Sequence, residues 1–314
     1  MKLALSTNWC NRRFESGEEI VDKALELGFD ELELGFHTTR FQADGFKRRL
    51  DEMPVGSVHA FCPVPVSAPQ GSPELYQLAS IDSDARALAR FHLARTVEFA
   101  ADMGATAVVL HAGRVGLGTF LRRGFGSADL RDILQKNNND TASKAYAKAL
   151  SKAMKLRRER GAALMEVFRG ELSGLIPLLE KLGIVLGLEN LPYLEGFPDE
   201  REMIEIGRQF AASPVKGWFD TGHDRVRMMH GWLEGVVRPP EGDLGLFAGM
   251  HLNDVKDYFD DHNAPGDGNV DFAALAPLAR AVDHVVFEPK DHVSDEALAR
   301  GVGLIRGLYC GKTA

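Results

Sequence analysis

The sequence predicts an α/β protein folded as a (β/α)8 TIM barrel, and three observations support this prediction. Short runs of β-type residues alternate with longer stretches of helical periodicity, a pattern typical of βα units and a parallel sheet. Eight β-type runs can be counted, which is the number of strands in such a barrel. Acidic and histidine side chains follow most of these runs, at the strand ends where the barrel gathers its functional groups.

The predicted strands are short apolar runs bounded by polar residues or glycine. They cover residues 2–6, 30–36, 56–61, 106–113, 183–190, 215–220, 247–254 and 283–289. Between them, apolar residues recur at three- and four-residue spacing, most clearly in 18–29, 86–105 and 170–184. Each of these helical stretches carries a glycine just before the next strand, a helix C-cap signal, and the glycines are Gly28, Gly104 and Gly183.

An open, doubly wound sheet is the alternative arrangement for alternating strands and helices. That fold expects a glycine-rich phosphate loop after the first strand, whereas residues 6–13 read STNWCNRR. A length of 314 residues with 45% hydrophobic content suits one large core. The sequence therefore favours the barrel, as a single domain over residues 1–314.

One interval is too long for an ordinary crossover. Roughly 70 residues separate the fourth and fifth predicted strands, and we predict an inserted helical segment at about residues 114–165. A solvated helix that lengthens one loop explains its second half, which has high helix propensity. A lid over an anionic substrate, a contact to a phosphate backbone and a subunit contact are the alternatives. These three alternatives are based on the basic face of the predicted helix, which is formed by Lys144, Lys148, Lys152, Lys155, Arg157, Arg158 and Arg160.

Composition restricts the partners and the compartment. The formal net charge of −8 argues against broad attraction to nucleic acid or to an anionic membrane, although a local basic groove stays open. Cys10, Cys62 and Cys310 form neither a disulfide framework nor a CxxC pair. The sequence contains no signal-peptide h-region and no run of about 18 apolar residues. We therefore expect a soluble cytoplasmic protein with no membrane partner, and we leave homo-oligomer formation open.

Nine potential metal ligands stand at or near the ends of predicted strands. Imidazole and carboxylate groups are the usual ligands of zinc, manganese and related cations. A parallel barrel brings its strand ends to one rim, so one pocket could hold all nine. They are His59, His111, Glu189, Asp220, His223, His251, Asp260, His262 and Glu288.

Each of these residues also has a structural explanation. A single histidine at a strand end is often only hydrogen-bonded, and Glu189 alone could be a buried acid paired with an arginine. Burying many such groups together without a cation, however, would cost several kcal/mol per charged group. Because a divalent cation reverses that effect, the pattern predicts a metal site.

The chain resembles the xylose isomerase-like TIM barrel superfamily over nearly its whole length except the insert, and four motifs are the most specific part of this resemblance. They are LGLENLP around Glu189, FDTGH from Asp220 to His223, HLND from His251 and DHNAPGDGNVDF from Asp261. The superfamily includes sugar isomerases and epimerases, and also abasic-site nucleases of the endonuclease IV type.

The resemblance implies a core metal held by Glu189, Asp220, His251 and Glu288. In the sugar branch, the two glutamates also act as the acid and base that move a proton beside a carbonyl, through an enediolate. The expected function is therefore a metal-dependent isomerase or epimerase of a sugar or sugar derivative. The cofactor would be Zn, Mn or Mg, with one to three ions.

The main alternative is an endonuclease IV-like phosphodiesterase. The resemblance implies a trinuclear zinc site there, with His59, His111, His223, Asp260 and His262 as further ligands. Two segments favour the sugar branch instead: NLPY follows Glu189 where a small-residue turn is expected, and VKDYFD follows HLND in place of a Gly, Ser and Arg lead-in. A non-catalytic metal- or sugar-binding barrel is the third reading.

Three more residues are candidates for substrate binding. Asn8 and Glu33 lie near the ends of the first two predicted strands, and Trp9 follows Asn8. Their polar or aromatic side chains could contact sugar hydroxyls or a sugar face. Helix capping or a supporting hydrogen bond is the structural alternative.

Overall fold

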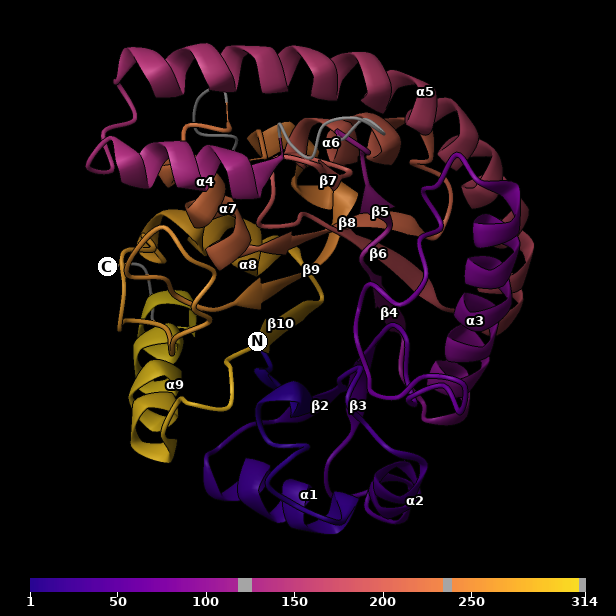
Figure 1. The fold of residues 1–314 in the computed structure, drawn as a ribbon. Helices are drawn as coiled ribbons and strands as arrows, with labels where there is room; N and C mark the ends of the chain where they lie inside the picture. Colours follow the sequence, from indigo (N-terminus) through magenta and orange to yellow (C-terminus); the bar gives the residue numbers. More distant parts are fainter. Residues whose placement is uncertain (118–125, 234–238, 311–314) are drawn as a thin grey trace.

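Eight parallel strands close into a barrel, which confirms the predicted fold (Figure 1). The computed structural model describes residues 1–117, 126–233 and 239–310. In barrel order, each strand pairs with its neighbours in sequence and β1 closes on β10. The strands are β1 (Ala4–Ser6), β2 (Glu31–Leu34), β3 (Val55–His59), β4 (Ala107–Leu110), β6 (Val185–Glu189), β8 (Val215–Asp220), β9 (Phe247–Leu252) and β10 (His284–Phe287).

Helices surround the barrel, and local sequence signals fix several of their ends. Capping boxes begin α1, α2 and α6, and Gly183 ends α5 in the left-handed conformation with φ of 67°. The helices are α1 (Gly17–Glu26), α2 (Arg40–Arg48), α3 (Ser83–Asp102), α4 (Ser127–Lys136), α5 (Lys144–Leu182), α6 (Glu200–Gln209), α7 (Thr221–Met229), α8 (Ala276–Ala281) and α9 (Asp295–Cys310). Short 3-10 helices cover Thr7–Trp9, Glu241–Leu246 and Ala273–Leu275.

The predicted insert differs from the structure at its far boundary. We expected it to end near residue 165, yet α5 runs without a break for 39 residues into the helix that precedes β6. The long α5 arches over one side of the barrel with α4 beside it (Figure 1). A two-stranded antiparallel ribbon of β5 (Gly113–Arg114) and β7 (Gly196–Phe197) joins the insert region to the loop after β6.

The basic face of the insert is not uniformly solvated. Lys144, Lys148, Lys152, Lys155 and Arg158 are exposed, whereas Arg157 is buried. In the described part of the chain, no helix has both the length and the apolar character needed to cross a bilayer.

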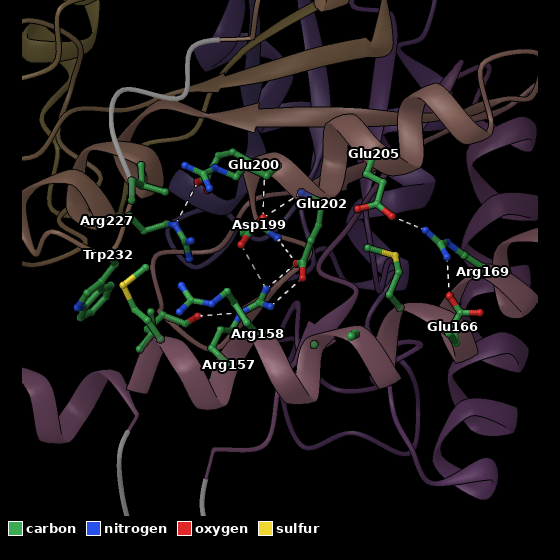
Figure 2. Close-up of a pocket in the computed structure, with 17 residues that line it drawn as sticks. Arg157, Arg158, Glu166, Arg169, Asp199, Glu200, Glu202, Glu205, Arg227 and Trp232 are labelled. Atoms are coloured by element: carbon green, nitrogen blue, oxygen red, sulfur yellow. Dashed lines mark hydrogen bonds and ion pairs between the residues drawn. The ribbon is translucent and has the colours of Figure 1, made fainter. Parts of the chain in front are cut away.

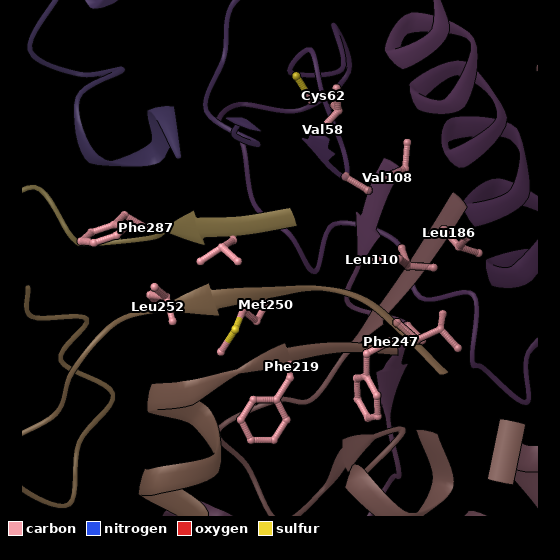
Figure 3. Packing of buried hydrophobic residues seen from close by; sticks show 14 of the residues in the cluster. Val58, Cys62, Val108, Leu110, Leu186, Phe219, Phe247, Met250, Leu252 and Phe287 are labelled. Carbon is pink, nitrogen blue, oxygen red and sulfur yellow. The ribbon is translucent and has the colours of Figure 1, made fainter. Parts of the chain in front are cut away.

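Alternate residues of the strands face two different hydrophobic regions. Val108 and Leu110 of β4 point outward and pack against the helix layer. They belong to the large hydrophobic core, and Figure 3 shows part of it. Ala107 and Val109 of the same strand face inward, in a small cluster with Trp218. This period of two is the side-chain pattern of a barrel strand.

Trp218 fills the barrel interior below the strand ends. Its ring is fully buried, and its centroid lies 5.3 Å from that of His251. Glycines on the neighbouring strands make room for it, because a Cβ at Gly187 or Gly249 would lie 2.7 or 2.4 Å from the indole ring. The indole therefore fixes the spacing of β6, β8 and β9 beneath the rim.

We expect Gly249→Ala to destabilise the protein by about 1–3 kcal/mol, because the added methyl group overlaps Trp218 and the strands must shift. Gly174→Ala is the control. It lies in α5, where an added Cβ meets nothing within 4 Å, and it should stabilise by about 0.5–1 kcal/mol. Urea unfolding measures both changes, and equal midpoints for Gly249→Ala and the wild-type protein would contradict this account.

Candidate metal centre

The barrel brings all nine predicted ligands to its carboxyl-terminal rim, where they form three adjoining groups. Glu189 and Asp220 end β6 and β8, and His59 ends β3. His251 lies within β9, while His111 and Glu288 directly follow β4 and β10. The pairing of neighbouring strands brings some of these residues close together, because Asp220 and His251 are direct partners in the β8–β9 register.

The first group joins four strands around the imidazole of His251. Nδ1 of His251 lies 3.3 Å from Glu189 Oε1, 3.3 Å from Glu288 Oε2 and 3.8 Å from Asp220 Oδ2. Glu189, Asp220 and His251 are fully buried, and Glu288 is 5% exposed. These are the four core ligands expected from the family resemblance.

Glu189 also belongs to a second group. Its Oε2 lies 3.2 Å from Nε2 of His59 and 3.2 Å from Nε2 of His111, while its Oε1 faces His251. One carboxylate therefore offers one oxygen to each of two groups. This is the geometry of a bridging ligand.

His223, Asp260 and His262 form the third group. Asp260 Oδ1 lies 3.0 Å from Nε2 of His262 and 3.7 Å from Nε2 of His223. The N-terminus of α7 connects this group to the first one, because Asp220 caps that helix by accepting a 2.7 Å hydrogen bond from the His223 backbone N–H.

Hydrogen bonds orient four of the five imidazoles. Nδ1 of His59, His223 and His262 lies 2.7–3.0 Å from a backbone carbonyl, which assigns the proton to Nδ1 and leaves Nε2 for a cation. His251 is reversed, because its Nε2 contacts Glu33 Oε1 at 3.0 Å and its Nδ1 faces the carboxylates.

The residues present fit divalent cations. Glu189 Oε1, His251 Nδ1 and Asp260 Oδ1 are buried and lack a hydrogen-bond partner among the described residues. Donor atoms on tetrahedral zinc with bonds of about 2.0–2.1 Å lie about 3.3 Å apart. The ligand atoms of each group lie within 4.8 Å of one another, and their closest His–carboxylate contacts, 3.0–3.8 Å, include that spacing.

The electrostatics of the three groups also favour positive charge. Burial disfavours the charged form of His223, but Asp220 and Asp260 outweigh it and raise the pKa of His223 to about 10. His251 behaves alike: burial opposes its charge, yet Glu288 and Glu33 raise its pKa well above the usual value. The carboxylates therefore favour positive charge at this rim, which is the property that a divalent-cation site requires.

Several residues that hold the ligands in place were not predicted. Asn253 Nδ2 donates to Asp220 Oδ2 at 2.7 Å, and Asn190 Oδ1 accepts from the Asp220 N–H at 2.7 Å. Asp254 accepts from the backbone N–H groups of Gly266 and Gly268 at 3.0 and 2.9 Å, and so shapes the loop that carries His262. The LEN and HLND motifs contain these residues, but neither motif says what an Asn or Asp will contact.

A pocket of about 400 Å³ opens above the metal-ligand groups. His59, His111, His223, His262 and Glu288 form its polar lining, together with Asn8, Arg12, Phe36, His37, Glu74, Tyr193 and Lys290 among others. Burial and Arg12 lower the pKa of His37 to about 4, so this histidine is neutral at physiological pH. A pocket of this volume accommodates a small molecule.

The three weaker substrate-binding predictions have different outcomes. Asn8 lines the pocket and donates to Glu288 Oε1 at 3.2 Å. Trp9 does not reach the pocket: it is fully buried and its indole donates to the Val293 carbonyl at 2.8 Å. Glu33 is also enclosed, since its carboxylate is taken up by His251 and the Ser57 hydroxyl, so we reassign it from substrate binding to support of His251.

These features define a (β/α)8 barrel with clustered His, Asp and Glu side chains at its carboxyl-terminal rim. The chain belongs to the xylose isomerase-like TIM barrel family, whose model matches residues 21–306. The comparison with curated proteins gave no match.

Solved structures share the fold over nearly the whole chain. The 3-keto-D-glucoside 4-epimerase from E. coli, in its apo form, has a TM-score of 0.64 at 18% identity, covering 98% of this chain and 99% of that chain. A D-psicose 3-epimerase in the presence of D-fructose has a TM-score of 0.60 at 14% identity, covering 99% and 100%. A protein from Thermus thermophilus, soaked with ZnCl2, has a TM-score of 0.56 at 21% identity, covering 100% of both chains. At these identities the likeness shows the fold alone.

We expect zinc affinity to fall as the pH is lowered from about 8 to about 6. The raised pKa of His223 means that the cation-free site holds a proton throughout this range, and zinc must displace it. One displaced proton weakens binding about tenfold per pH unit. Competition with a chromophoric chelator measures the affinity, and calorimetry in two buffers measures proton release. A pH-independent affinity without proton release would contradict the account.

We expect Glu33→Gln to weaken cation binding about 10–100-fold, because the amide no longer supports His251 as a carboxylate does. Glu31→Gln is the matched control, since Glu31 starts the same strand and contacts Lys2 instead. The same chelator competition reports both variants. Equal cation affinities for the Glu33→Gln and Glu31→Gln variants would show that Glu33 does not support cation binding.

Proposed function

We propose that the protein is a metal-dependent isomerase or epimerase of a sugar or sugar derivative. The pocket above the metal-ligand groups has the size of a small-molecule site and a lining rich in hydrogen-bonding groups. Solved structures with this fold include the sugar epimerases named above. Family membership and the four core ligands agree with that class.

The observation that carries the proposal is the position of Glu288. One of its oxygens faces His251 in the first group, and the other accepts a hydrogen bond from Asn8 at the pocket wall. Glu288 is thus a carboxylate that belongs to the ligand set and also lines the substrate pocket. A group in that position can take a proton from a bound substrate.

Different residues of the site and the pocket would have different tasks. Bound cations would stabilise negative charge on substrate oxygens during proton transfer. Glu288 would remove or return the proton, and Asn8 would hold its carboxylate in place. The family resemblance implies Glu189 and Glu288 as the acid and base pair, but both Glu189 oxygens face imidazoles and the residue is fully buried. We therefore propose Glu189 as a ligand and a pocket-lining imidazole such as His223 as the second proton-transfer group.

A specific observation supports phosphoester hydrolysis as the second candidate. The three ligand groups adjoin through Glu189 and α7, so the site offers places for up to three cations. Several cations can neutralise a phosphate together with its leaving oxygen. The histidine-rich second and third groups suit zinc, whereas the carboxylate-rich first group also suits manganese or magnesium.

We expect the metal-loaded protein to exchange the proton beside the carbonyl of a ketose with solvent. D-Fructose, D-psicose and D-tagatose in D2O, followed by proton NMR, report this step without requiring the natural substrate to be known. Metal removal by a chelator should abolish exchange, and Glu288→Gln should slow it by about 10²–10⁴-fold. Glu205→Gln, a surface carboxylate paired with Arg169, is the control and should exchange at the wild-type rate.

Elemental analysis and a nuclease assay separate the two candidates. One ion per chain together with ketose exchange supports the isomerase. Three zinc ions, no exchange and clean incision of a duplex oligonucleotide with one abasic site would replace it with the hydrolase. Exchange that persists in the metal-stripped protein would refute metal-dependent proton transfer.

A further inference from the structure

The loop after β6, residues 190–197, is held by arginines from three helices. Four of its backbone carbonyls accept hydrogen bonds from guanidinium groups. Arg131 of α4 donates to the Pro192 carbonyl at 3.3 Å, Arg227 of α7 donates to the Tyr193 carbonyl, and Arg157 of α5 donates to the Leu194 and Gly196 carbonyls at 3.2 and 2.8 Å. So many guanidinium donors on one short loop leave it little freedom.

Arg157 makes two of these four hydrogen bonds and is buried. It comes from the insert, is 5% exposed, and reaches across from α5 to the start of α6 (Figure 2). Its remaining guanidinium donors pair with Glu202 at 2.8 and 2.5 Å. A buried guanidinium with every direction satisfied fixes the geometry of the groups around it.

The N-terminus of α4, the other helix of the insert, contacts the same loop. The Ser127 hydroxyl of α4 accepts from the Leu194 N–H at 2.8 Å, and Ser127 also donates to Glu195 through its N–H and its hydroxyl at 2.9 and 2.7 Å. Val115, just after β5, donates its N–H to the Glu195 carbonyl at 2.7 Å. The insert therefore contacts the loop through both side-chain and backbone groups.

This loop carries Tyr193 into the wall of the substrate pocket. The guanidinium of Arg114 stacks on the Tyr193 ring at 3.8 Å and pairs with both oxygens of Glu74 at 2.6–2.8 Å. Tyr193 and Glu74 both line the pocket. The position of one pocket wall thus depends on contacts that the loop makes with α4, α5 and α7.

A cavity of about 360 Å³ between α5 and α6 lies beside these contacts. Its charged groups pair with one another: Arg157 with Glu202, Arg169 with Glu205, and Arg227 with Glu200 (Figure 2). This internal pairing leaves the lining without a dominant charge for a ligand. Of these pairs, only Arg157–Glu202 joins the insert to a barrel helix, and Arg157 and Arg227 also contact the loop.

We infer that Arg157 is a positioning residue, through which the insert fixes the loop 190–197 and sets the Tyr193 wall of the pocket. The consequence for catalysis, that the insert controls substrate affinity, rests on the proposed function. The role of Arg157 in fixing the loop does not rest on the proposed function, because the loop contacts are independent of the reaction. The inference also gives the helical insert a role other than a solvated extension.

The test introduces a fluorescent reporter by Tyr193→Trp. The native tryptophans Trp9, Trp218 and Trp232 are 0–2% exposed, so acrylamide should quench chiefly the introduced indole. Adding Arg157→Met should raise the quenching constant at least threefold, because the loop loses two carbonyl contacts. Arg169→Met is the matched control: it breaks ion pairs of the same helix beside the same cavity but touches no loop carbonyl, and quenching should stay unchanged.

The kinetic arm uses the ketose that the wild-type protein turns over. Arg157→Met should raise its KM at least tenfold, with kcat within threefold and metal content unchanged, whereas Arg169→Met should match the wild-type protein. If Arg157→Met does not fold, Ser127→Ala replaces it, with a smaller increase in quenching expected. Quenching equal to that of Arg169→Met in a folded variant would overturn the inference. Absence of any ketose turnover, with quenching as expected, would instead count against the proposed function alone.

Discussion

The carboxylate of Glu189, shared between two sets of imidazoles, is the constraint around which the rim is built. It is fully buried, with one oxygen toward His59 and His111 and the other toward His251. Such a density of buried charge is stable only with compensating positive charge, whether from protons or from cations. The rest of the rim supplies rigid support: Trp218 fills the barrel below, and Glu33 turns the ring of His251.

The substrate pocket has two kinds of wall. Its floor comes from strand ends, whose positions follow from barrel closure and which carry His59, His111 and Glu288. Its sides come from loops, and the Tyr193 side is held by helices that are additional to the barrel repeat. The floor fixes which chemistry the site can perform, while the sides determine which molecules fit. This division explains how one barrel serves many substrates.

The two candidate functions share one ligand set and differ in how the accessory residues are used. With one cation on the core four, His59, His111, His223 and His262 are free to contact substrate hydroxyls from the pocket lining. With three cations they would act as ligands, and Glu189 would belong to two of the ligand groups. Fold likeness cannot choose between these states, because the same scaffold accommodates both.

The strands, several helix ends and the nine clustered His, Asp and Glu side chains could be predicted from local signals: apolar runs, capping residues, and His, Asp or Glu at strand ends. The long interval between the fourth and fifth strands also predicted an insert. Only the tertiary structure decided that α5 continues past residue 165, that Arg157 turns inward, and that Trp9 and Glu33 lie away from the pocket. Each of those outcomes depends on partners distant in sequence, such as Glu202 for Arg157 and His251 for Glu33, and no local pattern encodes which distant groups will meet.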